Sequence, residues 1–201
     1  PGLDDVVEYR SNITREYIDR ANAVLVCVKS DALTGQEMGT IYSVFSNTRY
    51  NPEKVYIIAT QIDSLNRPRE NWIEQRKEWL KYLKGRGAYA SEKLADKNLV
   101  PVSAYLYTLL QNYNSLSDDD DRSWDLNSIL MKLRVRDINE HYQELLELTN
   151  IAVLKNKIQR EIVANYKKLL IEDISGNYEL CKESIAEAMQ KIKKTQEELI
   201  H

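Results

Sequence analysis

The sequence is poor in several residue types, and each shortage excludes a class of protein. Cysteine occurs only 2 times in 201 residues, too few for a disulfide framework or a four-ligand zinc site, and this favours a reducing, cytoplasmic setting. With 6 glycines and 4 prolines, the chain is neither collagen-like nor of low complexity. The longest apolar run, residues 23–28, is far shorter than the ~20 residues that cross a membrane as a helix.

Neither sign of charge is in large excess. The formal net charge is −3, and 29% of the residues are charged against 43% that are hydrophobic. This balance is typical of a folded domain and not of a disordered chain. Because neither half of the chain is basic, we expect no nucleic acid among its partners.

The beginning of the chain alternates between helical and strand-like patterns. Helical spacing over residues 4–20 precedes the β-branched run 23–28, which predicts a helix and then a strand buried on both faces, with Cys27 in its packing. Thr34 and Glu37 have the spacing of a capping box. A second helix is therefore expected to begin at about residue 35.

The same alternation continues to residue 103. Residues 55–60 predict a second buried strand, and Pro68 precedes a helix with an apolar stripe. Residues 99–103 predict a short third strand, at an edge because it contains Pro101. This order predicts an α/β fold with a parallel sheet of about three strands, whose ligands bind beyond the carboxyl ends of the strands.

The rest of the chain reads as helical. We expect a short helix at 105–116, one helix over 126–145 and another over 151–169, with a break at 173–177 around Gly176. The last segment repeats apolar positions in a seven-residue pattern. These positions are Cys181, Ile185, Ala188, Ile192 and Leu199. Residues 172–201 are therefore expected to begin a helical bundle or stalk whose other helices lie outside this chain.

A tetrad that can recognise a base follows the second predicted strand. Thr60-Gln61-Ile62-Asp63 resembles the guanine-recognition motif of GTP-binding proteins, which is Asn or Thr, then Lys, any residue, and Asp. Guanine presents an N1–H and a 2-amino group side by side, and the carboxylate of Asp63 can accept both. Adenine presents an acceptor there, so ATP should be rejected. A second interpretation, that Asp63 only caps the next turn, stays open.

The resemblance also gives roles to the neighbouring residues. Thr60 would tie the loop to adjacent chain by its hydroxyl, and Gln61, which replaces the usual Lys, would lie along the base with weaker stacking. Ser103-Ala104 resembles the Ser-Ala motif whose backbone N–H groups approach guanine O6. Pro1-Gly2 resembles the end of the Asp-x-x-Gly motif, which implies that Gly2 contacts the γ-phosphate. The implied ligand is GTP or GDP.

Residues around the first predicted strand resemble one particular superfamily of GTP-binding proteins. Residues 21–28 and 32–37 are similar to the segment of the dynamin superfamily in which an Ala-Asp-Ala strand leads into a Leu-Thr-x-x-Glu helix start. The resemblance to bacterial dynamin-like proteins implies that residues 1–171 are the carboxyl-side part of a P-loop GTPase domain, with a helical insertion around 105–150. In that family, GTP hydrolysis is coupled to self-association and commonly to membrane remodelling, so a peripheral membrane location is implied as well.

The phosphate-binding part of such a domain is missing from the sequence. There is no G-x-x-x-x-G-K-S/T motif, and the resemblance puts that loop and the Mg²⁺ ligands before Pro1. We therefore expect upstream polypeptide, since the chain begins without a methionine, and no GTP hydrolysis by this chain alone. The apolar edge of residues 23–28 is expected to be covered by other residues or by a second copy.

Two alternatives remain from the sequence. The chain could be a non-catalytic helical interaction or scaffold module, in which the sheet anchors helices of residues 126–201 that recruit partners. Asp118 to Asp121 could bind a divalent cation, but this run lacks the alternating ligands and the glycine of a calcium loop. A solvated acidic turn is the favoured interpretation.

Overall fold

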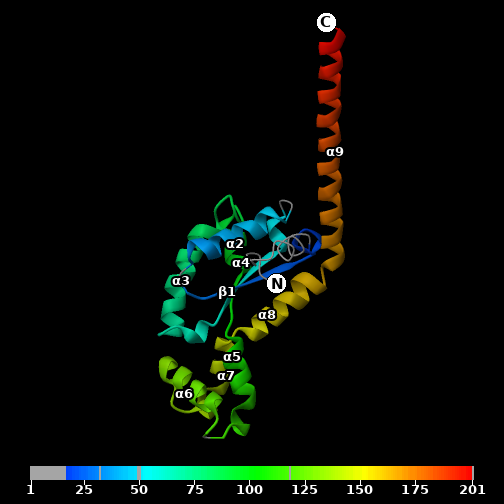
Figure 1. Ribbon diagram of the computed structural model, residues 1–201. Coiled ribbons are helices and arrows are strands. Elements are labelled where there is room, and N and C mark those ends of the chain that lie inside the picture. Colours follow the sequence, from blue (N-terminus) through cyan, green and yellow to red (C-terminus); the bar gives the residue numbers. More distant parts are fainter. Residues whose placement is uncertain (1–16, 32, 49–50, 118, 201) are drawn as a thin grey trace.

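The computed structural model describes residues 17–31, 33–48, 51–117 and 119–200 (Figure 1). The side chains of residues 169, 173 and 197–200 are not part of this description. The predictions for residues 4–16 and for Gly2 therefore lie outside the described residues.

One sheet of three parallel strands forms the centre of the described chain. Its strands are β1 (Val24–Lys29), β2 (Val55–Thr60) and β3 (Leu99–Pro101), in the spatial order β1-β2-β3. The register pairs Val24 with Val55 and Ile57 with Leu99. The predicted parallel sheet is confirmed, and so is the edge position of the strand that contains Pro101.

Three helices cover one face of this sheet. They are α2 (Gly35–Ser46), α3 (Pro68–Leu83) and α4 (Glu92–Asn98). The capping box at the start of α2 is present, because Thr34 accepts from the Glu37 N–H and the Glu37 side chain accepts from the Thr34 N–H. The largest apolar cluster lies between these helices and the strands, with Ile41, Trp79 and Ile57 fully buried in it.

Within the described residues, the second face is covered over β2 and β3 but not over β1. Helix α8 (Ile151–Lys157) and the π-helical segment η4 (Ile158–Val163) pack on this face, where Ile58 and Val100 are buried. On β1, Leu25 is 40% exposed and Cys27 is exposed too. The prediction that residues 23–28 are buried on both faces, with Cys27 in the packing, is therefore wrong. In the described residues β1 pairs only with β2, so a cover for its other edge stays a prediction.

A second group of helices lies below the sheet in Figure 1. It consists of α5 (Ala104–Asn112), the short turn η3 (Tyr113–Ser115), α6 (Asp121–Leu133) and α7 (Ile138–Leu148), which enclose their own apolar cluster. The single helix predicted over 126–145 is wrong. Arg134 adopts a left-handed conformation with φ 59° that ends α6, and Asp137 caps α7 by accepting from the Asn139 N–H. The ion pair of Arg69 with Glu144 links this group to α3.

Helix α9 (Tyr166–Ile200) projects away from the sheet, and the carboxyl end of the chain lies at its far tip (Figure 1). The break predicted at 173–177 is wrong, because α9 runs through Gly176. A glycine in a helix costs only about 1 kcal/mol relative to alanine, and α9 contains no proline to interrupt its hydrogen bonds. The helix predicted over 151–169 is instead divided by η4. No described helix is long and apolar enough to cross a membrane.

Candidate functional site

The loops that follow β2 and β3 lie side by side at one edge of the sheet. The β2 chain leaves the strand at Thr60 and continues through Gln61 into the 3₁₀ turn η2 (Ile62–Ser64). The β3 chain continues through Val102 and Ser103 into α5. The Val102 N–H donates to the Ala59 carbonyl at 2.7 Å, and the Ile62 N–H donates to the Val102 carbonyl at 3.4 Å. Carboxyl ends of parallel strands are the usual place for ligands in such sheets.

Asp63 and Ser103 meet directly where these loops adjoin. The Ser103 hydroxyl donates a hydrogen bond to Asp63 Oδ1. Both residues are buried, Asp63 with 7% and Ser103 with 1% of its surface exposed. The two residues that the sequence assigns to one site are therefore in contact. Asp63 makes no capping hydrogen bond to the described residues, which argues against the capping interpretation.

The carboxylate of Asp63 keeps acceptor capacity beyond this bond. A carboxylate has about four lone-pair sites. Ser103 occupies one of them, on Oδ1. Within the described residues Oδ2 makes no hydrogen bond, and it is not one of the fully buried atoms without a partner. Among the described residues, Oδ2 therefore keeps its acceptor capacity for a further donor.

Of the two backbone N–H groups expected to donate to guanine O6, only that of Ala104 is available. The Ser103 N–H donates to the Thr149 carbonyl at 3.0 Å, so this group is not available for guanine O6. This part of the prediction is corrected. The Ala104 N–H lies in the first turn of α5 and makes no hydrogen bond to a described residue. First-turn N–H groups of a helix have no partner inside it, and Ala104 is exposed, so its N–H can meet an external acceptor.

Gln61 holds an unusual backbone conformation in the β2 loop. Its φ of 60° and ψ of 39° are left-handed, a region that non-glycine residues rarely adopt. Its carbonyl accepts from the Ser30 hydroxyl at 3.0 Å and from the Ser64 hydroxyl at 2.7 Å. The Thr60 hydroxyl donates to the Val28 carbonyl at 3.2 Å, as expected of a residue that ties the loop to its neighbours. The side chain of Gln61 is exposed.

Ser30 is a part of the site that sequence reasoning missed. It follows β1 directly and is fully buried, and its N–H donates to the Thr60 carbonyl at 2.9 Å. Together with its hydroxyl bond to Gln61, this fixes the loop from the β1 side. A single serine after a strand belongs to no motif. Only the parallel pairing of β1 with β2 could have pointed to it.

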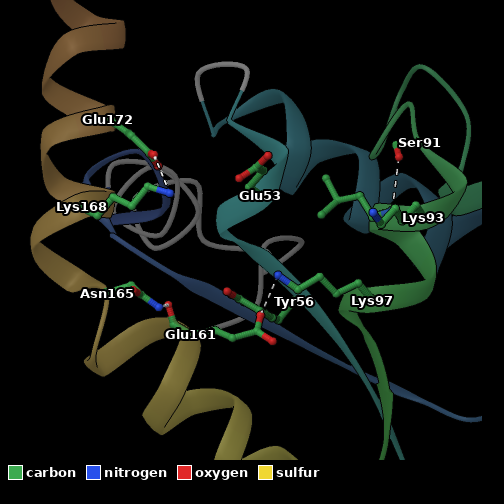
Figure 2. A pocket seen from close by; sticks show the side chains of 10 residues that line it. Glu53, Tyr56, Ser91, Lys93, Lys97, Glu161, Asn165, Lys168 and Glu172 are labelled. Atoms are coloured by element: carbon green, nitrogen blue, oxygen red, sulfur yellow. Dashed lines mark hydrogen bonds and ion pairs between the residues drawn. The ribbon is translucent and has the colours of Figure 1, made fainter.

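A cavity of about 510 Å³ lies at the opposite, amino-terminal end of β2 (Figure 2). Three lysines and three glutamates line it, and two pairs of them are in contact, Lys97 at 3.1 Å from Glu161 and Lys168 at 3.5 Å from Glu172. Burial, and secondarily the nearby Glu161, raises the pKa of Tyr56 in its wall to about 12. The paired charges leave no excess of one sign to attract an ionic ligand. We therefore do not place the site in this cavity.

No described residues form a cluster that could hold a metal ion. In the acidic run before α6, Asp120 accepts from the Arg122 N–H and forms an ion pair with the Arg122 guanidinium at 2.6 Å. The guanidinium and this N–H lower the pKa of Asp120. Asp120 thus acts as the cap of α6.

No protein-family model, curated protein or solved structure matches this chain.

Proposed function

We propose that the loops after β2 and β3 form the base-recognition half of a guanine-nucleotide site in a dynamin-like GTPase domain. The observation that carries the proposal is the hydrogen bond from Ser103 to Asp63, which joins the two predicted motifs across 40 residues of sequence. A parallel sheet with these loops at its carboxyl edge is compatible with a P-loop GTPase fold, and the motif resemblance supplies the finer assignment.

The available hydrogen-bonding groups match guanine. Asp63 Oδ2, with the lone pair that remains on Oδ1, accepts from the N1–H and the 2-amino group of the base. The Ala104 N–H donates to O6, and the side chain of Gln61 covers one face of the base. Adenine would oppose the carboxylate with a further acceptor, so ATP is rejected by an unpaired acceptor and not by size.

Hydrolysis requires parts that this sequence does not contain. Phosphoryl transfer needs the phosphate-binding loop, its lysine and a Mg²⁺ ion with its ligands. We assign base recognition to this chain and GTP hydrolysis to the longer protein in which it occurs, where Gly2 would contact the γ-phosphate. Coupling of the nucleotide state to self-association or membrane remodelling, and the cytoplasmic or peripheral membrane location, belong to the same proposal.

The variant Asp63→Asn tests the base assignment. Asparagine keeps an oxygen that can accept from Ser103, so the loops should fold unchanged. Its amide N–H₂ would face the 2-amino group of guanine, donor against donor, but would pair with the 2-oxo group of xanthine. We expect GDP to bind the wild-type chain more tightly than XDP and the variant to reverse this order, each by roughly 10-fold or more, as for a bidentate base contact.

Titration of each nucleotide, followed by NMR amide shifts, measures this preference. The matched control is Asp96→Asn on α4, whose carboxylate pairs with Arg76, a residue outside the proposed site. The control should keep the wild-type order. Equal affinities of GDP and XDP for the Asp63→Asn variant, or a wild-type chain that gives no shifts with GDP, would remove the guanine assignment.

The second candidate is a helical interaction module without a nucleotide site. The observation in its favour is the exposed apolar face of α9, which includes Ile171, Ile185 and Ile192. In this candidate the sheet anchors α8 and α9, and the helices of residues 126–201 recruit a partner. Nucleotide titration distinguishes the two, because this module predicts no preference among GDP, XDP and ADP.

A further inference from the structure

The exposed face of α9 has the spacing of a coiled-coil seam. Apolar or small residues recur at alternating intervals of three and four along the helix. They are Ile171, Ile174, Tyr178, Cys181, Ile185, Ala188, Ile192 and Thr195. We propose that a second copy of this chain packs antiparallel on this seam, centred between Ile185 and Ala188. The proposal is independent of the nucleotide site.

The seam is not used by the rest of the molecule. Tyr178 is 66%, Ile185 62% and Ile192 60% exposed. A groove of about 690 Å³ separates α9 from the chain around Pro52, and the residues of α9 that line it are Glu172, Gly176, Glu179, Leu180 and Glu183. Helical periodicity places these positions on the side of α9 opposite to the seam, so the side that faces the groove leaves the seam open.

The apolar area on the seam is sufficient for a dimer. The large exposed side chains that this register covers are Ile174, Tyr178, Ile185 and Ile192 on the seam and Met189 beside it. Each removes on the order of 100 Å² of apolar surface from water when it is covered. Two such helices together bury roughly 1,000 Å², which is the area that a specific interface should clear.

The sizes of the seam residues select a second copy and its direction. Tyr178, Ile185 and Ile192 occupy one heptad position, whereas Cys181, Ala188 and Thr195 occupy the other. In a parallel, in-register pair each residue meets itself, so bulky layers alternate with gaps. Protein interiors tolerate neither gaps nor overpacking.

The antiparallel arrangement pairs a large side chain with a small one in every layer from residue 178 to residue 195. Ile185 meets Ala188 of the second copy, and Ile192 meets Cys181. Tyr178 meets Thr195 by the same register. Each layer then holds a similar volume, which is the packing that specifies one arrangement. This self-complementarity is the reason to assign the seam to a copy of the same chain.

The flanking positions do not oppose this register. Lys191 falls nearest to Ser184 of the second copy, and Lys182 falls nearest to Met189. Neither lysine faces another cation, so the pair carries no like-charge repulsion of the kind that sets partner choice in coiled coils.

Sedimentation of the full chain tests the association. We expect a dimer for the wild-type chain at about 100 μM and a monomer for Ile185→Glu, with at least a 100-fold weaker association and unchanged helical circular dichroism. The matched control is Gln190→Glu, which adds the same charge outside the seam and should remain dimeric. A monomeric wild-type chain, or an Ile185→Glu variant that still dimerises, would overturn the proposal.

Disulfide trapping tests the direction. In a Cys27→Ser background, Cys181 should not crosslink to itself, because Ile192 of the second copy lies opposite. Adding Ile192→Cys should give a crosslinked dimer on mild oxidation, since facing seam residues lie within disulfide reach. The control that combines Ile192→Cys with Cys181→Ser should stay uncrosslinked.

Two outcomes of the trapping contradict the antiparallel register. One is efficient crosslinking through Cys181 alone, which indicates a parallel pair. The other is no crosslink after Ile192→Cys. Failure of this proposal is separable from failure of the nucleotide site, because the seam contains no residue of that site and its dimer is measured without nucleotide, in the wild-type chain and in the Asp63→Asn variant.

Discussion

Gln61 keeps a left-handed backbone because three groups hold its carbonyl. These are the Ser30 hydroxyl, the Ser64 hydroxyl and the Ser64 N–H. A left-handed conformation costs a non-glycine residue roughly 1 kcal/mol or more. Strain that the surroundings enforce is concentrated at functional sites, and the proposed base contact supplies such a function here.

The variant Gln61→Gly should separate the effect of the backbone strain on stability from the effect of the side chain on nucleotide affinity. We expect the free energy of unfolding to rise by about 1 kcal/mol, because glycine adopts this conformation without penalty. Affinity for GDP should fall, because the side chain that covers the base is lost. Urea unfolding and GDP titration measure the two effects. Gln61→Ala is the control: it should lose affinity without gaining stability, and a gain equal to that of glycine would contradict the strain.

Tyr56 predicts how stability responds to alkaline pH. Burial raises its pKa from 10 in the unfolded chain to about 12 in the folded one. Between these values the unfolded state releases a proton that the folded state retains, so stability is complete below pH 10 and falls as the pH rises towards 12. Tyr56→Phe should reduce this loss by about 1 kcal/mol between pH 9 and pH 11.

Urea unfolding at pH 9 and at pH 11 checks this expectation. Tyr82→Phe is the control, since it removes the hydroxyl of an exposed tyrosine. The same loss of stability in wild type and in Tyr56→Phe would show that other groups cause it. Tyr89 is one such group, because burial raises its pKa too and its hydroxyl donates to the Val55 carbonyl at 2.8 Å.

From the sequence, only those residues of the candidate site that belong to a recognisable motif could be predicted. The proximity of Asp63 and Ser103 was predictable, because each follows a strand and parallel strands end at one edge. The bond from the Ser103 N–H to the Thr149 carbonyl was not, because it depends on where α7 ends in space. The burial of Ser30 depends in the same way on the pairing of β1 with β2.

At the scale of elements, local chemistry predicted where helices begin better than where they end. Thr34 and Glu37 marked the start of α2 correctly, because a cap is a contact between near neighbours. The end of α6 at Arg134 has no such signal, since the residue in this left-handed position is usually a glycine and here it is an arginine. At Gly176 the error was the opposite one, because a helix end was predicted where the helix continues. A glycine weakens a helix but need not end it.

Gly176→Ala should therefore strengthen α9 and not distort it. A Cβ at this position would meet nothing within 4 Å. Alanine is favoured over glycine in a helix by about 1 kcal/mol, so exchange of the neighbouring amides should slow by about fivefold. Hydrogen exchange of residues 174–180 measures this. Gly39→Ala in α2, where the space is equally open, is the matched control and should slow exchange in that helix alone. Faster exchange around residue 176 would mean that α9 bends there.

At the scale of the whole molecule, the sequence predicted a sheet with helices packed against it, but not how much of the sheet those helices cover. The continuous apolar run of β2 correctly indicated a buried strand. On β1 the same composition is half exposed, because α8 and η4 reach only as far as β2 and β3. How far a helix extends across a sheet is set by tertiary geometry, which a pattern within one strand does not contain.

The carboxyl-terminal part of α9 should be separable from the rest of the chain. The described apolar clusters of the sheet and of the α5–α7 group include no residue beyond Ile162, and the groove beside α9 is lined no further than Glu183. A chain that ends at Glu183 should therefore keep the urea midpoint and the GDP affinity of the whole chain at low micromolar concentration. It should sediment as a monomer, because the centre of the proposed seam is removed. A lower urea midpoint would show that the projecting helix stabilises the sheet, and a dimer would place self-association elsewhere on the molecule.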